Sequence, residues 1–579
     1  MKEKTFMNHQ PEKILFRLLA VMALLLCGCQ AKGTGEEPKQ SEAESPAETA
    51  KDSETIVLLH TNDVHCGLDE KIGYDGLYLY KEELEQQYDN ILLVDAGDAI
   101  QGGIYGSLSK GDLIISLMNE VGYDCATLGN HEFDYGFDVL DDLSEKLNCG
   151  YICANFCTAD GETVFEPYRL FERAGKTIAL IGIVTPTAFA NSPIHSLIDD
   201  QGNPMYDFMS DETGERLIRC VQKNVDEVRE KGADIVILLT HLGNGDGDDT
   251  RYHSGEVIQN TTGIDLVIDG HSHDEIIGNV KNIDGVEVPV TQTGTKLASI
   301  GKITILPDNT ITMELVEEIP EPHGIDAELV IRKGKQYWVD SSIQRKTETL
   351  TACYQDVLNR KIGEITYDLP IRDGDTPVYK TQENGMCSLF ADALRETGDA
   401  EAGLIVSANI REGLHAGEIT YAEAVRCLPY GNDIIVISLK GQDLLDALEF
   451  GARKLPAAIN GFVQVSGIEY TVNLSIPSSV KEDADNTFLS VDGPYRVENV
   501  QINGEPLDLE REYSVATSYY LYTAGDGMSM LGNGELLSYT QKTDNEVLTY
   551  YIENTLNGII PERYASKEGR IMILSSSEN

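Results

Sequence analysis

The chain has 579 residues, of which 41% are apolar, and this is the composition of a globular protein that buries most of its length. A single hydrophobic core does not extend over so many residues, so several domain-sized units, or two large ones, are expected. The 96 acidic and 45 basic residues give a formal net charge of -51, which argues against nonspecific binding to nucleic acid or anionic lipid. A phosphate-bearing ligand would need locally concentrated positive charge, which bound metal ions supply well.

The N-terminal segment has the features of an export signal. Basic residues precede an apolar run at 18–26, which is shorter than the roughly 20 residues that span a bilayer. The following Leu26-Cys27-Gly28-Cys29 resembles a bacterial lipobox, and this resemblance implies cleavage before Cys29 and lipidation of its thiol. Residues 30–54 have almost no large apolar side chains and are predicted to be a disordered linker. We therefore expect a signal peptide over 1–29 and a protein held on the extracellular side of the cell membrane by a lipid anchor only.

Five apolar runs in the next part of the chain are each followed by a polar cluster. The runs are 55–61, 91–94, 125–128, 235–240 and 266–269, and their alternation with amphipathic segments predicts strands and helices of an α/β fold. The carboxyl ends of strands in such a sheet share one edge, where ligands bind. We therefore expect the polar clusters to converge.

The converging clusters offer carboxylate, amide and imidazole groups. They contain Asp63, His65, Asp98, Asn130, His241, His271 and His273. This mixture suits Zn, Mn, Fe or Co, and seven ligands are too many for one ion, which favours two divalent metal ions bridged by a carboxylate. Taken singly, a histidine after a strand is more often a hydrogen-bonded residue of the core than a metal ligand.

The order of these motifs is more specific than any one of them. DxH, GD, GNHE, an isolated His and GHxH, each after an apolar run, resemble the calcineurin-like metallophosphoesterases over residues 55–306. The resemblance implies a four-layer-type α/β domain with mixed β sheets, which we place at 55–320.

The resemblance also implies a division of roles among the candidate residues. One metal is expected at Asp63, His65 and His273, and the other at Asn130, His241 and His271, with Asp98 bridging the two. His131 and Asp134 are expected to form a catalytic dyad in which the carboxylate orients the imidazole. The implied reaction is in-line attack on phosphorus by a metal-bridging hydroxide.

The second half of the chain is predicted to be a separate, smaller α+β domain over 361–579. Pro residues at 320 and 322 mark a boundary, and the periodicity of 326–359 predicts a helix or a pair of helices, so 321–360 is assigned as a helical connector. Helices are expected at 385–397 and 441–452, and strands at 434–439 and 512–516.

Motifs in this C-terminal part resemble, in order, those of the 5'-nucleotidases. They are Glu383-Asn384-Gly385, Ala391-Asp392-Ala393, Asn409-Ile410-Arg411, Leu428-Pro429-Tyr430-Gly431-Asn432, Tyr519-Tyr520-Leu521 and Gly525-Asp526-Gly527. The resemblance implies that Arg411 contacts an anionic or carbonyl group of the substrate, that the base stacks between Tyr430 and Tyr520, and that Asp526 accepts from ribose hydroxyls. It adds Lys380, Asn409 and Asn432 to the substrate-binding residues. The alternative for each tyrosine is an ordinary core aromatic.

Three departures from the family pattern leave the substrate preference open. Val406-Ser407-Ala408-Asn409 stands where the family has a glycine-rich stretch that opens with Asn. Lys380 stands at the place of an arginine and cannot form a bidentate fork. Tyrosines replace the commoner phenylalanines at both stacking positions.

The predicted function is metal-dependent hydrolysis of nucleoside 5'-monophosphates to nucleoside and phosphate at the cell surface. A UDP-sugar hydrolase and a 2',3'-cyclic nucleotide phosphodiesterase are alternatives of the same class. A non-catalytic lipoprotein that binds nucleotide or metal is the alternative of another class, although it would have no need of His131. The expected partners are a small-molecule nucleotide and a membrane reached through the lipid anchor; no nucleic acid is expected, and no protein partner is evident.

Overall fold

A computed structural model describes residues 50–68, 70–188, 197, 203–245, 251–483, 486–523 and 525–574. The predicted signal peptide, Cys29 and most of the predicted linker lie outside the described residues. The first strand, β1, begins at Asp52, so the expected linker boundary at residue 54 is too late. None of the helices in this described part of the chain has both the length and the apolar character needed to cross a bilayer.

The first of two mixed sheets in the N-terminal part has the strand order β14-β13-β1-β2-β3-β4. Its strands are β1 (Asp52–Thr61), β2 (Tyr88–Asp95), β3 (Cys125–Thr127), β4 (Tyr151–Ile152), β13 (Ile300–Ile305) and β14 (Ile311–Val316). Strands β1 to β4 run parallel, whereas β13 pairs antiparallel with both β1 and β14.

The second sheet has the order β11-β12-β10-β9-β7-β6. Its strands are β6 (Tyr168–Arg173), β7 (Lys176–Val184), β9 (Ile235–His241), β10 (Leu266–Ile268), β11 (Glu275–Lys281) and β12 (Glu287–Thr293). Strands β7, β9, β10 and β12 run parallel, and β6 and β11 are antiparallel. A separate short pair joins β5 (Cys157–Thr158) to β8 (Tyr206–Asp207).

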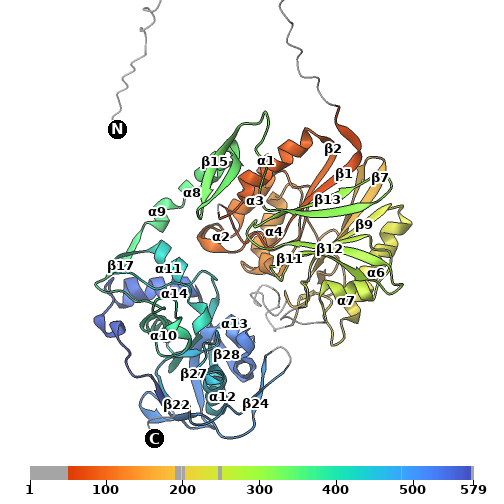
Figure 1. The fold of residues 1–579 in the computed structure, drawn as a ribbon. Coiled ribbons are helices and arrows are strands. Elements are labelled where there is room, and N and C mark those ends of the chain that lie inside the picture. Colours follow the sequence, from red (N-terminus) through yellow and green to blue (C-terminus); the bar gives the residue numbers. More distant parts are fainter. Residues whose placement is uncertain are drawn as a thin grey trace, which may run out of the picture. The chain divides into compact units, whose positions relative to one another are not determined.

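The two sheets pack face to face, and helices cover their outer faces (Figure 1). Ile56 and Leu58 of β1 join the core between the sheets, while Val57 and Leu59 pack on the outer side. That side carries α1 (Gly73–Glu85), α2 (Gly103–Ser109), α3 (Asp112–Val121) and α4 (Phe137–Lys146), and the other sheet carries α6 (Glu215–Glu230) and α7 (Ser254–Gln259). Burial on both faces explains the continuous apolar runs in the sequence, and the predicted four-layer α/β architecture is confirmed.

The connector is only partly helical, so the prediction of helix from 326 onward is wrong for its first half. Strands β15 (Ala327–Arg332) and β16 (Lys335–Asp340) form a hairpin, followed by α8 (Ser341–Ala352) and α9 (Gln355–Leu358). The hairpin turn has φ of 47° at Lys333 and 81° at Gly334, as a two-residue turn with both central residues left-handed requires. Bidentate hydrogen bonds from Arg332 to Asp75, at 3.0 and 2.6 Å, join the hairpin to α1.

The C-terminal part is built on a five-stranded sheet of order β21-β18-β27-β20-β28 and a four-stranded sheet of order β26-β25-β22-β29. The first consists of β18 (Ala402–Val406), β20 (Asp433–Lys440), β21 (Val463–Ser466), β27 (Glu512–Ser518) and β28 (Glu535–Thr543). The second consists of β22 (Ile468–Asn473), β25 (Val497–Ile502), β26 (Glu505–Pro506) and β29 (Ile571–Leu574). Short pairs join β17 (Lys361–Ile365) to β19 (Gly417–Thr420) and β23 (Val480–Glu482) to β24 (Phe488–Val491).

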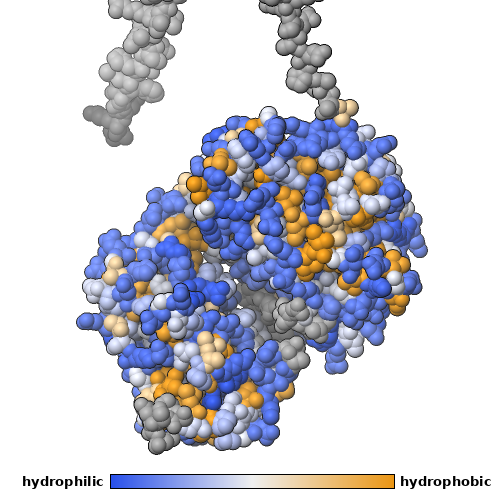
Figure 2. Space-filling model, in the orientation of Figure 1, coloured by the Kyte–Doolittle hydropathy of each residue, from blue (hydrophilic) through white to orange (hydrophobic). Residues whose placement is uncertain are grey.

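Helices lie on both faces of the five-stranded sheet. One face packs with α12 (Gly441–Ala452), and the other packs with α10 (Gly385–Thr397), α11 (Tyr421–Cys427) and α14 (Asp544–Tyr550). The bounds of α10 and α12 are those predicted, and the mixture of helices and strands agrees with the predicted α+β class. The face of the molecule in Figure 2 is mostly hydrophilic, in keeping with the high net charge.

Candidate active site

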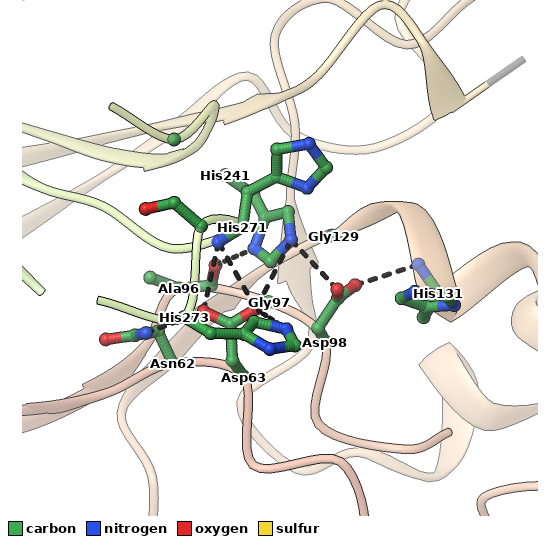
Figure 3. Close-up of polar contacts among 12 residues, drawn as sticks. Asn62, Asp63, Ala96, Gly97, Asp98, Gly129, His131, His241, His271 and His273 are labelled. Atoms are coloured by element: carbon green, nitrogen blue, oxygen red, sulfur yellow. Dashed lines mark hydrogen bonds and ion pairs between the residues drawn. The ribbon is translucent and has the colours of Figure 1, made fainter. Parts of the chain in front are cut away.

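The predicted metal-binding residues lie at the carboxyl ends of strands in the two N-terminal sheets. Asp63 and His65 follow β1, Asp98 follows β2, Asn130 follows β3, His241 ends β9, and His271 and His273 follow β10. The first three strands run parallel to one another, as do the last two, so the turns of each sheet share one edge. Figure 3 shows the side chains from both sheets gathered around Asp63 and Asp98.

Two groups of three donor side chains are present among the described residues. Asp63, His65 and His273 form the first group, and Asp98, His241 and His271 form the second, with the donor atoms of each group within 4.8 Å of one another. In the first group, Nε2 of His65 lies 3.0 Å from Nε2 of His273. Oδ2 of Asp98 lies 3.0 Å from Nε2 of His241 and 3.8 Å from Nε2 of His65, so this carboxylate lies between the groups.

Hydrogen bonds behind the imidazoles leave Nε2 of His65 and of His241 facing the centre. Nδ1 of His241 lies 2.7 Å from the carbonyl oxygen of Ala96 and is therefore the protonated nitrogen. Nδ1 of His65 lies 3.3 Å from both the backbone and the side-chain oxygen of Gln101. These contacts fix ring orientations in the manner of metal-binding histidines.

The donor set fits divalent cations on the chemistry of its buried atoms. Nε2 of His241 is buried and, although it lies 3.0 Å from Asp98, lacks the geometry of a hydrogen bond. Oδ1 of Asn130 is also buried and has no hydrogen-bond partner among the described residues. Buried polar atoms of this kind need a partner, and a cation between carboxylates and imidazoles would supply one.

The pKa shifts in this centre show that its buried carboxylates are stabilised by neighbouring positive charge. Burial raises the pKa of Asp98, but the imidazoles of His241, His131 and His65 hold it well below its usual range. Burial lowers the pKa of His65 to about 4, so this ring is neutral, as a metal ligand must be. Asp98 and Asp63 outweigh burial at His241 and raise its pKa to about 10.

Most of the donor residues have an unusual backbone conformation. The φ angles of Asp63, His65, Asp98, His271 and His273 are 50°, 45°, 59°, 84° and 59°. Non-glycine residues rarely adopt positive φ, and each costs roughly 1–3 kcal/mol unless the surroundings impose it. Their concentration at one edge marks a functional site rather than an ordinary set of turns.

His131 and Asp134 form a close pair beside the donors. Nδ1 of His131 lies 2.7 Å from Oδ2 of Asp134, and the imidazole is 35% exposed. Burial lowers the pKa of His131, but Asp134 and Asp98 more than offset this and raise it to about 10. Its backbone N–H donates to Oδ1 of Asp98 at 2.8 Å, which places the pair next to the second donor group.

The predicted substrate-binding residues of the C-terminal part form a second cluster. The guanidinium of Arg411 lies 5.5 Å from the ring centroid of Tyr430. Burial raises the pKa of the Tyr430 phenol, the positive charge of Arg411 lowers it, and the negative charge of Asp526 raises it further. The Asp526 backbone N–H donates to the Tyr520 hydroxyl at 3.2 Å.

Lys380 contacts Asn460, a residue that no motif in the sequence indicates. Nζ of Lys380 donates to Oδ1 of Asn460 at 2.6 Å, and the backbone oxygen of Asn460 accepts from Ala408 at 3.1 Å. Oδ1 of Asn409 is buried and makes no hydrogen bond with any described residue. Asn432 differs from the expectation, because its amide donates to Oδ2 of Asp544 at 3.0 Å and is already engaged within the domain.

Tyr430 and Tyr520 are 40% and 39% exposed. A core aromatic would be buried, so the alternative interpretation of these two tyrosines is wrong. Exposed aromatic rings beside an arginine and a carboxylate suit the recognition of a nucleoside.

Matches to two family models cover most of the described chain. The calcineurin-like phosphoesterase model matches residues 56–275, and the 5'-nucleotidase C-terminal domain model matches residues 361–533. Their order along the chain is the order of the donor groups and of the aromatic cluster.

Curated relatives extend over both parts. The chain is 26% identical to a 5'-nucleotidase of Vibrio cholerae, over 88% of this chain and 93% of that protein. It is 25% identical to the trifunctional nucleotide phosphoesterase protein YfkN of Bacillus subtilis, over 89% of this chain but only 35% of that longer protein.

Solved structures share the fold. A putative 5'-nucleotidase from Staphylococcus aureus aligns with a TM-score of 0.69 and 21% identity, covering 90% of this chain and 99% of that one. A 5'-nucleotidase precursor from Thermus thermophilus aligns with a TM-score of 0.61 and 24% identity, covering 90% of this chain and all of that one. The chain thus has a calcineurin-like phosphoesterase domain followed by a 5'-nucleotidase C-terminal domain, which is the two-domain organisation of the 5'-nucleotidases.

Proposed function

We propose that this protein hydrolyses nucleoside 5'-monophosphates to nucleoside and phosphate. The observation that carries the proposal is the pair of donor groups that share buried Asp98, with the His131–Asp134 pair beside them. The cluster around Arg411 and Tyr430 supports a nucleotide as the substrate.

Asp63, His65 and His273 would hold one divalent ion, and Asn130, His241 and His271 would hold a second, with Asp98 between them. Zn, Mn, Fe and Co suit this mixture of oxygen and nitrogen donors. Such ions, when bound, polarise the phosphoryl group and lower the pKa of water that attacks it.

The chain's own residues then orient and stabilise the reacting group. Asp134 accepts the hydrogen bond from Nδ1 of His131, which leaves Nε2 as the ring atom that can donate to a phosphoryl or leaving-group oxygen. Because the imidazole is partly exposed, a substrate can reach it. The Asp134 carboxylate fixes the orientation of the His131 ring before substrate binds, so no binding free energy is needed to order the ring.

In the C-terminal domain, Arg411 offers a planar fork of donors to an anionic group, and the rings of Tyr430 and Tyr520 offer faces for stacking a base. Asp526 can accept from ribose hydroxyls, and Lys380 adds positive charge. In a chain with a net charge of -51, these two cations provide local positive charge for an anionic ligand.

The proposed location is the extracellular side of the cell membrane, with Cys29 as the lipid-modified residue. The support is the lipobox-like Leu26-Cys27-Gly28-Cys29 after a short apolar run. An enzyme in this place would remove the charged phosphate and release a neutral nucleoside.

The first prediction concerns the substrate. Purified protein with added Mn²⁺ or Zn²⁺ is expected to release phosphate from AMP and UMP much faster than from a simple aryl phosphate, and a chelator is expected to stop the reaction. Phosphate release is measured colorimetrically alongside UDP-glucose and 2',3'-cyclic AMP. Turnover of only those two would keep the metal centre and refute the monophosphate assignment, and no turnover at all would favour a binding protein.

The second prediction concerns His131. His131→Ala is expected to lower kcat for AMP by about 100- to 10,000-fold, because a positioned proton donor is lost, while the metal content stays the same. Steady-state kinetics and elemental analysis measure both quantities. His415→Ala is the matched control, since His415 also lies near an aspartate, Asp368 at 3.7 Å, but is 89% exposed outside both clusters. An unchanged kcat for His131→Ala would contradict the assigned role.

The third prediction concerns base stacking. Tyr430→Ala is expected to lower kcat/KM for AMP by roughly 5- to 150-fold, since a stacked base contributes about 1–3 kcal/mol. Tyr430→Phe should keep most of the activity, and hydrolysis of glycerol phosphate, which has no base, should change little.

Tyr550→Ala provides the matched control, because Tyr550 is 44% exposed and has Lys542 at 5.2 Å from its ring centroid. Equal losses for AMP and glycerol phosphate, or an equal loss in the Tyr550 variant, would refute stacking on Tyr430.

The fourth prediction concerns the anchor. Cys29→Ala is expected to move the protein from the membrane fraction to the soluble fraction without lowering its specific activity, because the lipid is the only expected attachment. Fractionation followed by immunoblotting measures the distribution, and mass spectrometry of the wild-type N-terminus identifies the modification. A variant that stays in the membrane fraction would exclude Cys29 as the anchor.

A further inference from the structure

Glu132 is a buried carboxylate that joins two of the donor-bearing turns. It is 1% exposed, and its Oε2 accepts from the backbone N–H of Asp98 and of Gly129, both at 2.7 Å. Its Oε1 accepts from the backbone N–H of Ala99 at 2.8 Å. One side chain therefore ties the turn after β2, which carries Asp98, to the turn after β3, which carries Asn130.

Asp269 has the same relation to two turns of the second sheet. It is fully buried, and its Oδ1 accepts from the backbone N–H of Leu242 at 2.9 Å and from Oγ1 of Thr240 at 2.8 Å. Its Oδ2 accepts from Nε2 of Gln292 at 3.2 Å. Asp269 thus joins the end of β9, where His241 lies, to the turn that carries His271.

The hydrogen bonds that Glu132 and Asp269 accept come from backbone and side-chain donors at or beside the strand ends. Asp63 and Asp98 accept backbone hydrogen bonds too, but they also have oxygen atoms within 3.8 Å of imidazole Nε2 atoms. Strand ends leave backbone N–H groups without sheet partners, and these carboxylates supply the acceptors. Glu132 lies 34 positions from Asp98 along the chain, and Asp269 lies 29 and 27 positions from Thr240 and Leu242, so chain connectivity alone does not fix the distance between the turns.

The geometry points to Glu132 and Asp269 as positioning residues. Each is a clasp, that is, a buried carboxylate that joins two turns and so sets the spacing of the donors they carry. The donors concerned are those of the second group together with Asn130. The inference rests on the proposed function, because it concerns the same metal centre, and it predicts unequal effects on the two metal sites. Loss of either clasp weakens the second metal site more than the first, because the clasps hold the turns that carry Asn130, His241 and His271. Asp63 of the first site has other partners, since it accepts from the side-chain amide of Asn62 at 2.6 Å and from the backbone N–H of His271 at 3.0 Å.

The test is a calorimetric titration of metal-free protein with Mn²⁺ alone. In Glu132→Gln and Asp269→Asn, an amide replaces one acceptor oxygen with an NH₂ group that faces backbone donors. We expect one of the two Mn²⁺ affinities to fall by about 10- to 100-fold while the other stays within about threefold, and kcat to fall more than KM changes.

Glu449→Gln is the matched control. Glu449 is also fully buried and accepts from the backbone N–H of Arg496 and Val497, at 2.9 and 2.8 Å, but lies in the C-terminal domain. Its variant is expected to lose thermal stability as the others do and to keep both Mn²⁺ affinities. Equal effects on Mn²⁺ binding in all three variants would overturn the inference.

Milder variants cover the case in which a clasp variant does not fold. Thr240→Val removes one hydrogen bond to Asp269 with little change of shape, and Glu132→Asp keeps the charge but shortens the reach. Folded variants of both with two wild-type Mn²⁺ affinities would overturn the inference. Failure of the proposed function gives a different result, namely two Mn²⁺ sites in the wild type without phosphate release.

Discussion

Asp63 and Asp98 are buried together, and each has an oxygen within 3.8 Å of Nε2 of both His65 and His241. Two carboxylates that are removed from water beside the same imidazoles are unfavourable unless positive charge lies between them. The imidazoles supply part of it, as the opposite pKa shifts of Asp98 and His241 show. Divalent cations would supply the remainder, and the strained turns, the clasps and the sheet edges all serve to keep these donors in place.

The fold explains how residues far apart in the sequence reach one centre. Parallel strands in two stacked sheets present their carboxyl ends at the same side, and helices on both outer faces bury the central strands. The site therefore rests on a rigid scaffold, while the C-terminal domain contributes exposed aromatic rings and cations. Under the proposed function, phosphate chemistry and nucleoside recognition would belong to separate cores.

Much of the fold and of the metal-binding site could be predicted, because both follow from local patterns in the sequence. Apolar runs that end in polar clusters indicated the strands and their donors, and α10 and α12 have the predicted bounds. The hairpin at 327–340 was missed, although Lys333-Gly334 between alternating segments indicates a tight turn. The contacts of Asn460 with Lys380, and the roles of Glu132 and Asp269, depend on pairings across tens of residues that no local pattern records.

The most direct measurement of the central claim is anomalous X-ray scattering from crystals of the full chain grown with Mn²⁺. The account predicts two strong peaks per chain, one among Asp63, His65 and His273 and one among Asn130, His241 and His271, with Asp98 contacting both. A single peak, or peaks away from these residues, would contradict the dinuclear centre on which the proposed function depends.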